Sequence, residues 1–292
     1  MISANTKGAL WMVLSGAMAT GMSLAIRALA GDIPSTVITF VRCLLGMLIV
    51  APLALQPERW RTQHLGMQVL RGLAAAVAIN CGYYALTVLP LTAATVLFFS
   101  APLYVTALAP WLLQEPVGWR RWGATITGFV GVVIVLRPAP SAFDPNALVA
   151  LVAGLFFALV LIIGRRMAAN DRPSTVMLYT SAVTTVATLP PALVQWRLPD
   201  NAETWLLLAV AAGFGTARTY ADIRAYAEGD TSFVSVFQYL RLLMIAVGAY
   251  FLFSETPDAG TLTGGAVIIA ATLYISQREA RLGRGSGGRV GG

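Results

Sequence analysis

The sequence predicts an all-α membrane protein with ten transmembrane helices arranged as two inverted five-helix repeats. Composition predicts the membrane class, because 57% of the 292 residues are hydrophobic and only 11% are charged. So few polar side chains cannot cover a soluble protein of this length. An internal repeat, found at a single offset along the chain, predicts the division into two halves.

Apolar runs of about 20 residues recur from end to end, and each is long enough to cross a hydrocarbon core of about 30 Å as a helix. They lack the strict alternation of apolar and polar residues that is typical of an outer-membrane barrel. The first run also resembles a signal peptide, but its counterpart in the second half cannot be one, so we interpret it as a span. Breaks at proline, glycine and charge clusters predict spans at residues 8–28, 34–55, 66–87, 92–113, 119–136, 147–167, 174–195, 204–225, 231–253 and 260–276.

The repeat is clearest in two stretches, AIRALAGDIPSTV ending at Val37 and GRRMAANDRPSTV ending at Val176, which is 139 positions after Val37. Besides the shared last four residues, an arginine, an alanine and an aspartate coincide at this offset. We therefore expect a first repeat at residues 1–140 and a second at residues 141–277. Because each repeat has an odd number of spans, the second enters the membrane from the opposite side, which makes the repeats inverted.

Basic residues are distributed unevenly between the two sides of the predicted membrane. Fourteen lysines and arginines fall on the side of the amino terminus, and three fall on the other side, namely Arg27, Arg137 and Arg197. Cytoplasmic loops carry an excess of lysine and arginine. We therefore expect an inner-membrane protein with both termini in the cytoplasm. The Gly-rich, basic segment 278–292 is predicted to be a disordered cytoplasmic tail.

Several classes of function lack their motifs in this sequence. No G-x-x-x-x-G-K-[ST] loop is present to hold a nucleotide, and no H-E-x-x-H motif is present to bind zinc. The only histidine, His64, falls in a predicted loop, so no histidine lies in a span to activate a serine. We expect no enzyme activity, no cofactor and no metal. Because the arginines are scattered at span ends, we also expect no nucleic-acid partner.

Corresponding spans of the two halves share a pattern, in which an apolar span ending in glutamate precedes a glycine-rich span. The two copies read APLYVTALAPWLLQEPVGWRRWGATITGFVGVVIVL and YLRLLMIAVGAYFLFSETPDAGTLTGGAVIIAATLYI. With Pro102, Glu115 and Glu255, the pattern resembles the EamA-type members of the drug/metabolite transporter superfamily. Leu242 departs from the family pattern, which has proline there. By general likeness the sequence is most similar to the aromatic amino acid exporter group.

The resemblance implies a secondary transporter that works by alternating access around a central cavity between the halves. It also implies export of amino acids, including aromatic ones, or of related small metabolites across the inner membrane. We expect the protein to lie in the lipid bilayer as a monomer. One alternative is a proton-coupled exporter of lipophilic cations or drugs, but that chemistry needs an accessible carboxylate in the cavity, and the first span has none. A facilitative pore or a lipid scramblase is a third class.

Four charged residues lie well inside predicted spans, where a charge costs at least about 2.5 kcal/mol. Arg241 is near the middle of a span that the resemblance places at the cavity wall, so we expect it to bind a substrate carboxylate or to act in a gate. Arg42 is a second candidate for substrate binding, with neutralisation of a neighbouring carboxylate as the alternative. Arg218 and Asp222 are four residues apart, which predicts an ion pair on one helix face. The alternative is that Asp222 takes up a proton during transport.

Polar and aromatic residues gather in the third, fourth and ninth spans, and they predict the rest of the cavity wall. For Tyr83 and its neighbour Tyr84 the alternative is an aromatic belt at the membrane interface. For Glu115 and Glu255, at span ends, capping of the next helix is the simpler interpretation. The predicted wall residues are Asn80, Tyr83, Phe99, Ser100, Tyr104, Gln238 and Tyr239.

Overall fold

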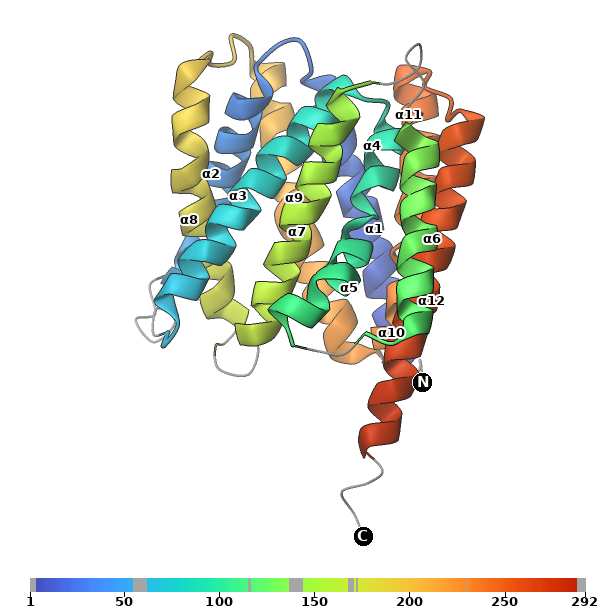
Figure 1. Cartoon of the computed structure of the whole chain (residues 1–292). Coiled ribbons are helices and arrows are strands. Elements are labelled where there is room, and N and C mark those ends of the chain that lie inside the picture. Colours follow the sequence, from blue (N-terminus) through green and yellow to red (C-terminus); the bar gives the residue numbers. More distant parts are fainter. Residues whose placement is uncertain are drawn as a thin grey trace.

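The structure, a computed structural model, describes residues 4–54, 62–114, 117–136, 144–167, 171, 173–229 and 231–287. Its helices run side by side as one bundle, and α1 begins on the side at which α12 ends (Figure 1). We call this the terminal side. The helices are α1 (Ala4–Ala28), α2 (Ser35–Ala54), α3 (Leu65–Val88), α4 (Leu91–Phe98), α5 (Ala101–Leu112), α6 (Trp119–Leu136), α7 (Asn146–Met167), α8 (Pro173–Val194), α9 (Ala202–Glu228), α10 (Thr231–Phe237), α11 (Leu240–Phe253) and α12 (Ala259–Gly287).

The helix positions follow the apolar runs of the sequence. Each predicted span begins within a few residues of the start of a helix, and the fourth and ninth spans each correspond to two consecutive helices. Seven helical segments of the described chain are long and apolar enough to cross a membrane, with α4 and α5 taken together as one. The prediction of a multi-pass, all-helical membrane protein is therefore confirmed, and the number of ten spans stays a prediction.

The packing of the helices repeats between the two halves. By the repeat, α1 corresponds to α7 and α3 corresponds to α9. α1 packs on α9, and the corresponding helices α7 and α3 pack on each other in the same way. In two further pairs, α2 with α8 and α6 with α12, each helix packs on its own counterpart in the other half. The chain runs toward the terminal side through α4 and α5, and away from it through α10 and α11 (Figure 1). These observations are consistent with two repeats of opposite orientation.

Two helical paths are interrupted at matching positions of the repeat. α4 ends at Phe98 and α5 begins at Ala101, while α10 ends at Phe237 and α11 begins at Leu240, in each case 139 positions later. In the first half, Pro102 lacks the N–H group that would continue the helix across the break. The second half has Leu242 near this position and is interrupted all the same. The interruption is thus a property of the fold that does not depend on proline.

Helices α6 and α12, one from each half, approach each other closely. A Cβ atom added to Gly131 would lie 2.8 Å from the carbonyl oxygen of Gly264, and one added to Gly264 would lie 2.6 Å from the carbonyl oxygen of Gly131. Only glycine fits at such a distance. Small residues of this kind let membrane helices pack backbone against backbone.

Large apolar side chains fill the end of the bundle that faces away from the terminal side. Ile26 lies in the last turn of α1, Leu29 directly follows α1, Leu86 lies in the last turns of α3, and Leu91 begins α4; each is at most 2% exposed. This end of the bundle is therefore closed by packed side chains.

α12 continues to Gly287 and so includes the first part of the segment that was expected to be a disordered tail, whose disorder stays a prediction. Its last turns project beyond the rest of the bundle (Figure 1). Arginine, glutamate, alanine and leucine after residue 277 are strong helix formers, and they extend the helix before the glycines end it. The remainder of the predicted tail lies outside the described residues.

Candidate substrate-binding site

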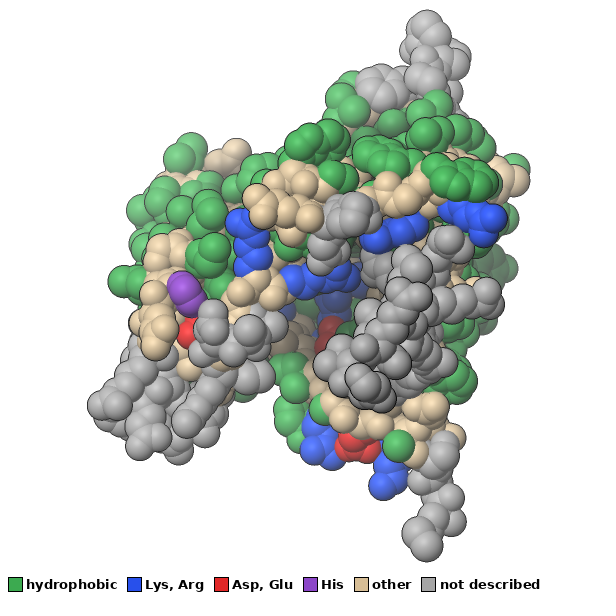
Figure 2. Space-filling view, turned by 60° about the horizontal axis from the view of Figure 1, so that its bottom comes forward, with side chains coloured by type: hydrophobic (Ala, Val, Ile, Leu, Met, Phe, Trp, Pro, Cys, Tyr) green, Lys and Arg blue, Asp and Glu red, His purple; other side chains and the backbone are tan. Residues whose placement is uncertain are grey.

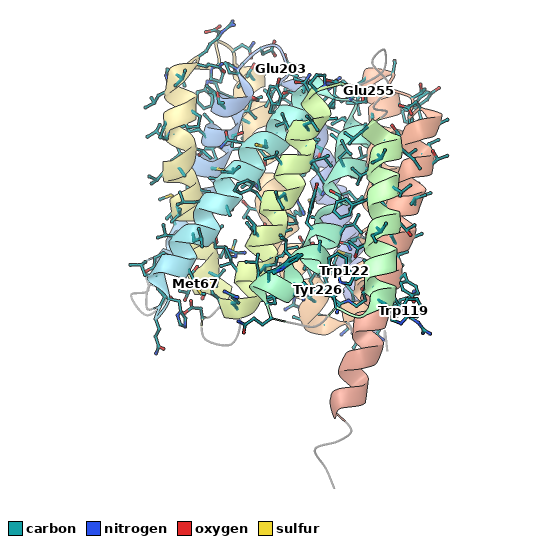
Figure 3. All side chains as sticks on the ribbon, viewed as in Figure 1. Met67, Trp119, Trp122, Glu203, Tyr226 and Glu255 are labelled. Carbon is teal, nitrogen blue, oxygen red and sulfur yellow. The ribbon has the colours of Figure 1, made fainter. Side chains whose placement is uncertain are left out.

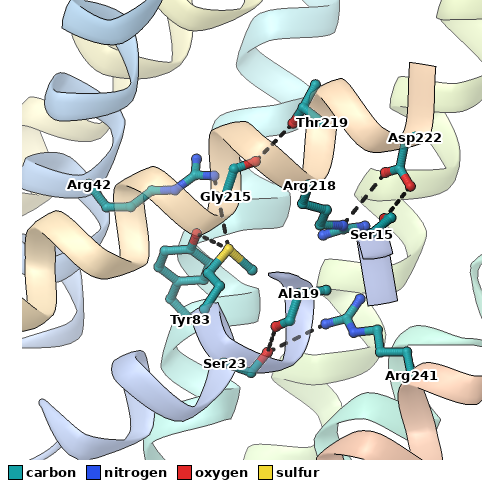
Figure 4. A network of polar contacts seen from close by, with 11 residues as sticks. Ser15, Ala19, Ser23, Arg42, Tyr83, Gly215, Arg218, Thr219, Asp222 and Arg241 are labelled. Carbon is teal, nitrogen blue, oxygen red and sulfur yellow. Dashed lines mark hydrogen bonds and ion pairs between the residues drawn. The ribbon is translucent and has the colours of Figure 1, made fainter. Parts of the chain in front are cut away.

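Four charged side chains from three helices converge inside the bundle. Arg42 comes from α2, Arg218 and Asp222 come from α9, and Arg241 comes from α11, so both halves contribute (Figure 4). The sequence predicted each of these residues separately, and the structure brings them into one polar network. Tyr83 of α3, which was also predicted, belongs to the network, whereas its members from α1 and Gly215 of α9 were not predicted.

The ion pair on α9 has the geometry that its spacing predicted. Arg218 Nε lies 3.6 Å from Asp222 Oδ2, and the two side chains are 31% and 33% exposed. Ser15 of α1 donates a hydrogen bond to the other carboxylate oxygen of Asp222. Asp222 is thus already shared between a cation and a hydroxyl group, and it joins α9 to α1.

Arg42 is held by contacts that carry no negative charge. Its Cζ atom lies 5.9 Å from the centre of the Tyr83 ring, a distance at which a cation is attracted to the ring face. Its Nη2 atom lies 4.0 Å from the sulfur of Met22, to which the Tyr83 hydroxyl also donates at 3.5 Å. The Nε atom of Arg42 is buried without a hydrogen-bond partner. Arg42 therefore retains hydrogen-bonding capacity that the described residues do not use.

The guanidinium of Arg42 lies directly on the backbone of α9. A Cβ atom added to Gly215 would lie 2.0 Å from Arg42 Nη2 and 2.8 Å from Cζ. No other residue type at this position is compatible with the observed side-chain conformation. Gly215 thus sets the place of the cation without contributing any side chain of its own.

Arg241 follows the break between α10 and α11 and reaches toward α1. Its Nη2 atom lies 3.5 Å from the hydroxyl oxygen of Ser23, and its Nε atom is buried without a partner. Ser23 donates its own proton to the carbonyl of Ala19 at 2.9 Å. Among the described residues, neither Arg241 nor Arg42 has a carboxylate within ion-pair distance. With three arginines and one carboxylate, the site carries an excess of positive charge.

The neighbouring residues Tyr83 and Tyr84 lie in different environments, one inside the bundle and one at its surface. Tyr83 is 6% exposed and lies beside Arg42, so it does not belong to an aromatic belt. Tyr84 is the exposed one of the pair, and its hydroxyl donates to Asn146 at 2.9 Å. The interior position of Tyr83 is what places it in the polar network.

The other predicted wall residues are distributed around the broken helices. The rings of Phe99 and Tyr239 lie 5.1 Å apart and join the two breaks, with Gln238 next to Tyr239 in the chain. Tyr104 packs against Phe129, at 5.2 Å between ring centres. Among the described residues, no side-chain contact joins these residues to the arginines, so their part in binding stays a prediction.

Two predicted polar side chains are engaged by their own helices. Ser100 is fully buried and donates to the carbonyl of Leu97 at 2.6 Å. Asn80 donates to the carbonyl of Ala76 at 3.0 Å, although its Oδ1 atom is buried without a partner. The proton of the buried Ser100 hydroxyl is therefore engaged within its own helix, whereas Asn80 keeps one free acceptor.

The bundle is hollowed on the terminal side. Figure 2 shows this face with a recess near its centre and with Lys and Arg side chains around it. The partial exposure of Arg218 and Asp222 agrees with an opening toward this side. The structure therefore has one open end and one closed end.

The closed end carries an ion pair that links four helices. Arg27 is at the end of α1, and its Nη2 atom lies 2.7 Å from Glu255 Oε1. Its Nη1 atom donates to the carbonyl oxygen of Thr87 at 2.6 Å. The other oxygen of Glu255 accepts the backbone N–H of Leu91 at 2.8 Å. Glu255 lies at the end of the bundle opposite the terminal side (Figure 3). It does cap a helix, but that helix is α4 of the other half and not the one that follows it. Glu115 lies outside the described residues.

The sequence interpretation missed the contributions of Ser15, Met22, Ser23 and Gly215. One signal was available, because Ser15 and Ser23 are eight residues apart and so lie on one face of α1. The contact of Gly215 with Arg42 has no local signal, since it joins residues of different halves.

Comparison with known proteins identifies the family. The model of the EamA-like transporter family matches residues 6–137 and again residues 145–277. The chain belongs to this family. The two matches together cover nearly the whole of this EamA-like transporter. Since the family is one of transporters, the chain is a membrane transporter. The expected superfamily is thereby confirmed.

Relatives of known function are similar over nearly their full length. The S-adenosylmethionine uptake transporter of Rickettsia felis is 31% identical over 271 residues, which cover 92% of each chain. The riboflavin transporter of Vibrio cholerae is 32% identical over 286 residues, which cover 95% of each chain. The pseudopaline exporter of Pseudomonas aeruginosa is 24% identical and covers 93% of this chain and 96% of its own. These names do not support the predicted likeness to the aromatic amino acid exporter group.

A solved structure, titled "Crystal structure of protein", shares the fold. It aligns with a TM-score of 0.62 and 17% identity, over 95% of this EamA-like transporter and 99% of that chain. At this level of identity the likeness concerns the fold alone.

Proposed function

We propose that this EamA-like transporter is a secondary transporter that binds a small organic solute through a carboxylate group, with amino acids and their derivatives as the substrate class. The observation that carries the proposal is the charge of the central site. Arg42 and Arg241 each keep a buried Nε atom without a partner, and the one carboxylate nearby is shared between Arg218 and Ser15. A carboxylate ligand would supply the missing acceptors in the form of charge-assisted hydrogen bonds.

The relatives support this class in part. S-adenosylmethionine, named for the Rickettsia relative, is an amino acid with a carboxylate, an ammonium group, a positively charged sulfonium and an aromatic base. Arg241 or Arg42 suits the carboxylate and Tyr83 suits an aromatic ring, whereas Asp222 already has Arg218 and Ser15 as partners. Riboflavin, named for the Vibrio relative, has a fused aromatic ring and no carboxylate. It is the second candidate, favoured by the aromatic pair Phe99 and Tyr239.

The alternative of a lipophilic-cation exporter fits the site less well. A cation entering the network would meet three arginines and one carboxylate that already has partners. Like charges at close range in a weakly screened site repel one another by several kcal/mol in total, roughly 4 kcal/mol for one pair at 4 Å. The site therefore favours a solute that carries a carboxylate over a cation that has none.

Transport direction and topology remain part of the proposal. The relatives include both uptake and export, so their names favour neither direction. We retain export, an inner-membrane location, cytoplasmic termini and inverted repeats at residues 1–140 and 141–277. Flux into and out of liposomes tests direction, and cysteine labelling at residue 292 and in loop 137–146 tests orientation. Labelling of both positions from one side would contradict the inverted arrangement.

The binding proposal is tested by measuring substrate-dependent thermal stabilisation of the purified protein. Each acid is compared with a partner that lacks the carboxylate: L-phenylalanine with L-phenylalaninamide, and S-adenosylmethionine with its decarboxylated form, with riboflavin as a carboxylate-free third ligand. We expect preference for the acid. Arg241→Gln keeps similar length and hydrogen-bonding groups, and we expect it to weaken acid binding about ten- to a hundredfold, since one charged hydrogen bond contributes about 1.5–3 kcal/mol.

Arg224→Gln is the matched control, because Arg224 lies on the same helix as Arg218 but pairs with Glu228 at 2.5 Å, outside the network. It should leave the preference for the acid unchanged. If Arg241→Gln retains the full preference, Arg241 is not the partner of the carboxylate, and the same comparison is made with Arg42→Gln. Retention in both variants would refute the proposal.

A further inference from the structure

A groove on the outside of the bundle has a composition that the transport site does not explain. It lies between α3, α5 and α7, has a volume of about 300 Å³, and is lined by ten apolar residues and by Arg166. Three of the lining residues of α3, Leu70, Leu73 and Val77, are exposed at the surface of the bundle. In a membrane protein this surface faces lipid, so the occupant of the groove has to be apolar over most of its length.

The length of the groove matches one leaflet of a bilayer. Its walls run from Met67 to Val77 on α3 and from Phe156 to Arg166 on α7. At a rise of about 1.5 Å per residue, each wall is about 15 Å long, which is half of a hydrocarbon core of about 30 Å. Met67 lies near the terminal side of the bundle (Figure 3). The groove therefore extends from the terminal side to the middle of the membrane.

The volume of the groove suits a hydrocarbon chain better than a helix of another protein. A helix about 10 Å across would fill roughly 1,200 Å³ over 15 Å, about four times the volume of the groove. A single chain of methylene groups, with carbon atoms in contact at about 4 Å, fills roughly 200 Å³ over that length. The hydrocarbon chain is therefore the closer match to the volume of the groove.

The single charge of the groove lies at its outer end. Arg166 is in the last turn of α7, directly after Arg165, and its side chain is exposed. Within the described residues no carboxylate is at ion-pair distance from Arg166. An arginine at this depth attracts the anionic headgroups of lipids. An apolar trough that ends at a cation has the chemistry of a lipid with a negative headgroup.

We propose that this groove binds one anionic phospholipid from the leaflet on the terminal side. One acyl chain lies between α3 and α7, against Leu73, Val77 and Phe156, and the phosphate group lies at Arg166. The headgroup and the chain are recognised together, so a free phosphate ion or an uncharged detergent satisfies only part of the site.

The test is native mass spectrometry of the full-length protein in detergent, titrated with phosphatidylglycerol or with phosphatidylcholine of the same acyl chains. We expect a first phosphatidylglycerol to bind at least about fivefold more tightly than phosphatidylcholine, the effect of one basic residue near the surface. Arg166→Gln should remove this preference. Val77→Trp fills the groove from its exposed rim and should weaken the binding of both lipids.

Arg120→Gln is the control, because Arg120 is another exposed arginine, stacked at 5.1 Å on Trp119 and not part of the groove. It should behave as wild type. Equal affinity for the two lipids, an equal loss in Arg120→Gln and Arg166→Gln, or unchanged binding in Val77→Trp would each overturn the proposal. A dimer that Val77→Trp converts to a monomer would also overturn it, since a second copy would then occupy the groove. Because the readout is lipid binding, its failure is distinct from failure of the proposed transport function.

Discussion

Removing one charge at the closed end should open it. Glu255→Gln preserves the size of the side chain and one acceptor oxygen, but it removes the ion pair with Arg27 at 2.7 Å. The charge-assisted hydrogen bond would contribute about 1.5–3 kcal/mol if buried. The two side chains are 23% and 17% exposed, so partial screening reduces this to about 1–2 kcal/mol. If the bond exists only while this end is closed, its loss shifts the equilibrium toward the open form about five- to thirtyfold.

The assay measures how fast a membrane-impermeant thiol reagent modifies Ala94→Cys from the side of Glu255. Ala94 is fully buried on α4, one turn beyond Leu91, whose N–H the carboxylate accepts. The native Cys43 and Cys81 are first replaced, so that only the new thiol reacts. Because a buried thiol reacts only after opening, the rate should rise by the same five- to thirtyfold in Glu255→Gln.

Two comparisons separate this mechanism from general loosening of the fold. Glu228→Gln makes the same chemical change in the pair with Arg224, within one helix on the terminal side, and should leave the rate unchanged. The double variant Arg27→Gln, Glu255→Gln should add little to either single change, because both remove the same interaction. A rate within twofold of wild type, or equal acceleration by Glu228→Gln, would refute the reasoning.

Three further predictions concern the central site. Gly215→Ala places a methyl group 2.0 Å from Arg42 Nη2, so the side chain of Arg42 has to move. We expect substrate binding, measured by thermal stabilisation, to be at least about tenfold weaker. The yield of folded protein, measured by size-exclusion chromatography, should be normal. Asp222→Asn should leave flux insensitive to an imposed pH gradient, as in wild type, because Arg218 and Ser15 hold the carboxylate; a large gradient-dependent flux that the variant abolishes would show proton coupling. Ser100→Ala should bind substrate as wild type does in an equilibrium titration, since its hydroxyl already donates to Leu97; tenfold weaker binding would place Ser100 in contact with the ligand.

The fold was largely predictable because a bilayer imposes its thickness on every helix. Apolar runs of about 20 residues, interrupted by proline, glycine and charge, locate the spans without knowledge of their partners. The extension of α12 to Gly287 was not predicted, because a Gly-rich composition was weighed above the helix formers that precede the glycines. The pairing of α1 with α9 and of α3 with α7 depends on contacts between the halves, which no local pattern records.

The candidate site was predictable in its charges and not in its contacts. Arg42, Arg218, Asp222 and Arg241 stand out because a charge inside a span is costly and rare. Their convergence, and the burial of Tyr83 beside Arg42, follow from the arrangement of the helices in space. Glu255 looked like a local helix cap because the chain does not reveal that Arg27, more than two hundred residues away, lies beside it.

The close contact between Arg42 and Gly215 has a consequence for the evolution of the family. Because the cation and the hydrogen atom of the glycine occupy adjoining space, a change at one position alters what the other tolerates. A lineage that replaces the arginine with a short neutral residue frees the opposite position to acquire a side chain, and a lineage that keeps the arginine does not gain that freedom. We therefore expect positions 42 and 215 to vary together among EamA-like transporters, even where the residues around them have diverged.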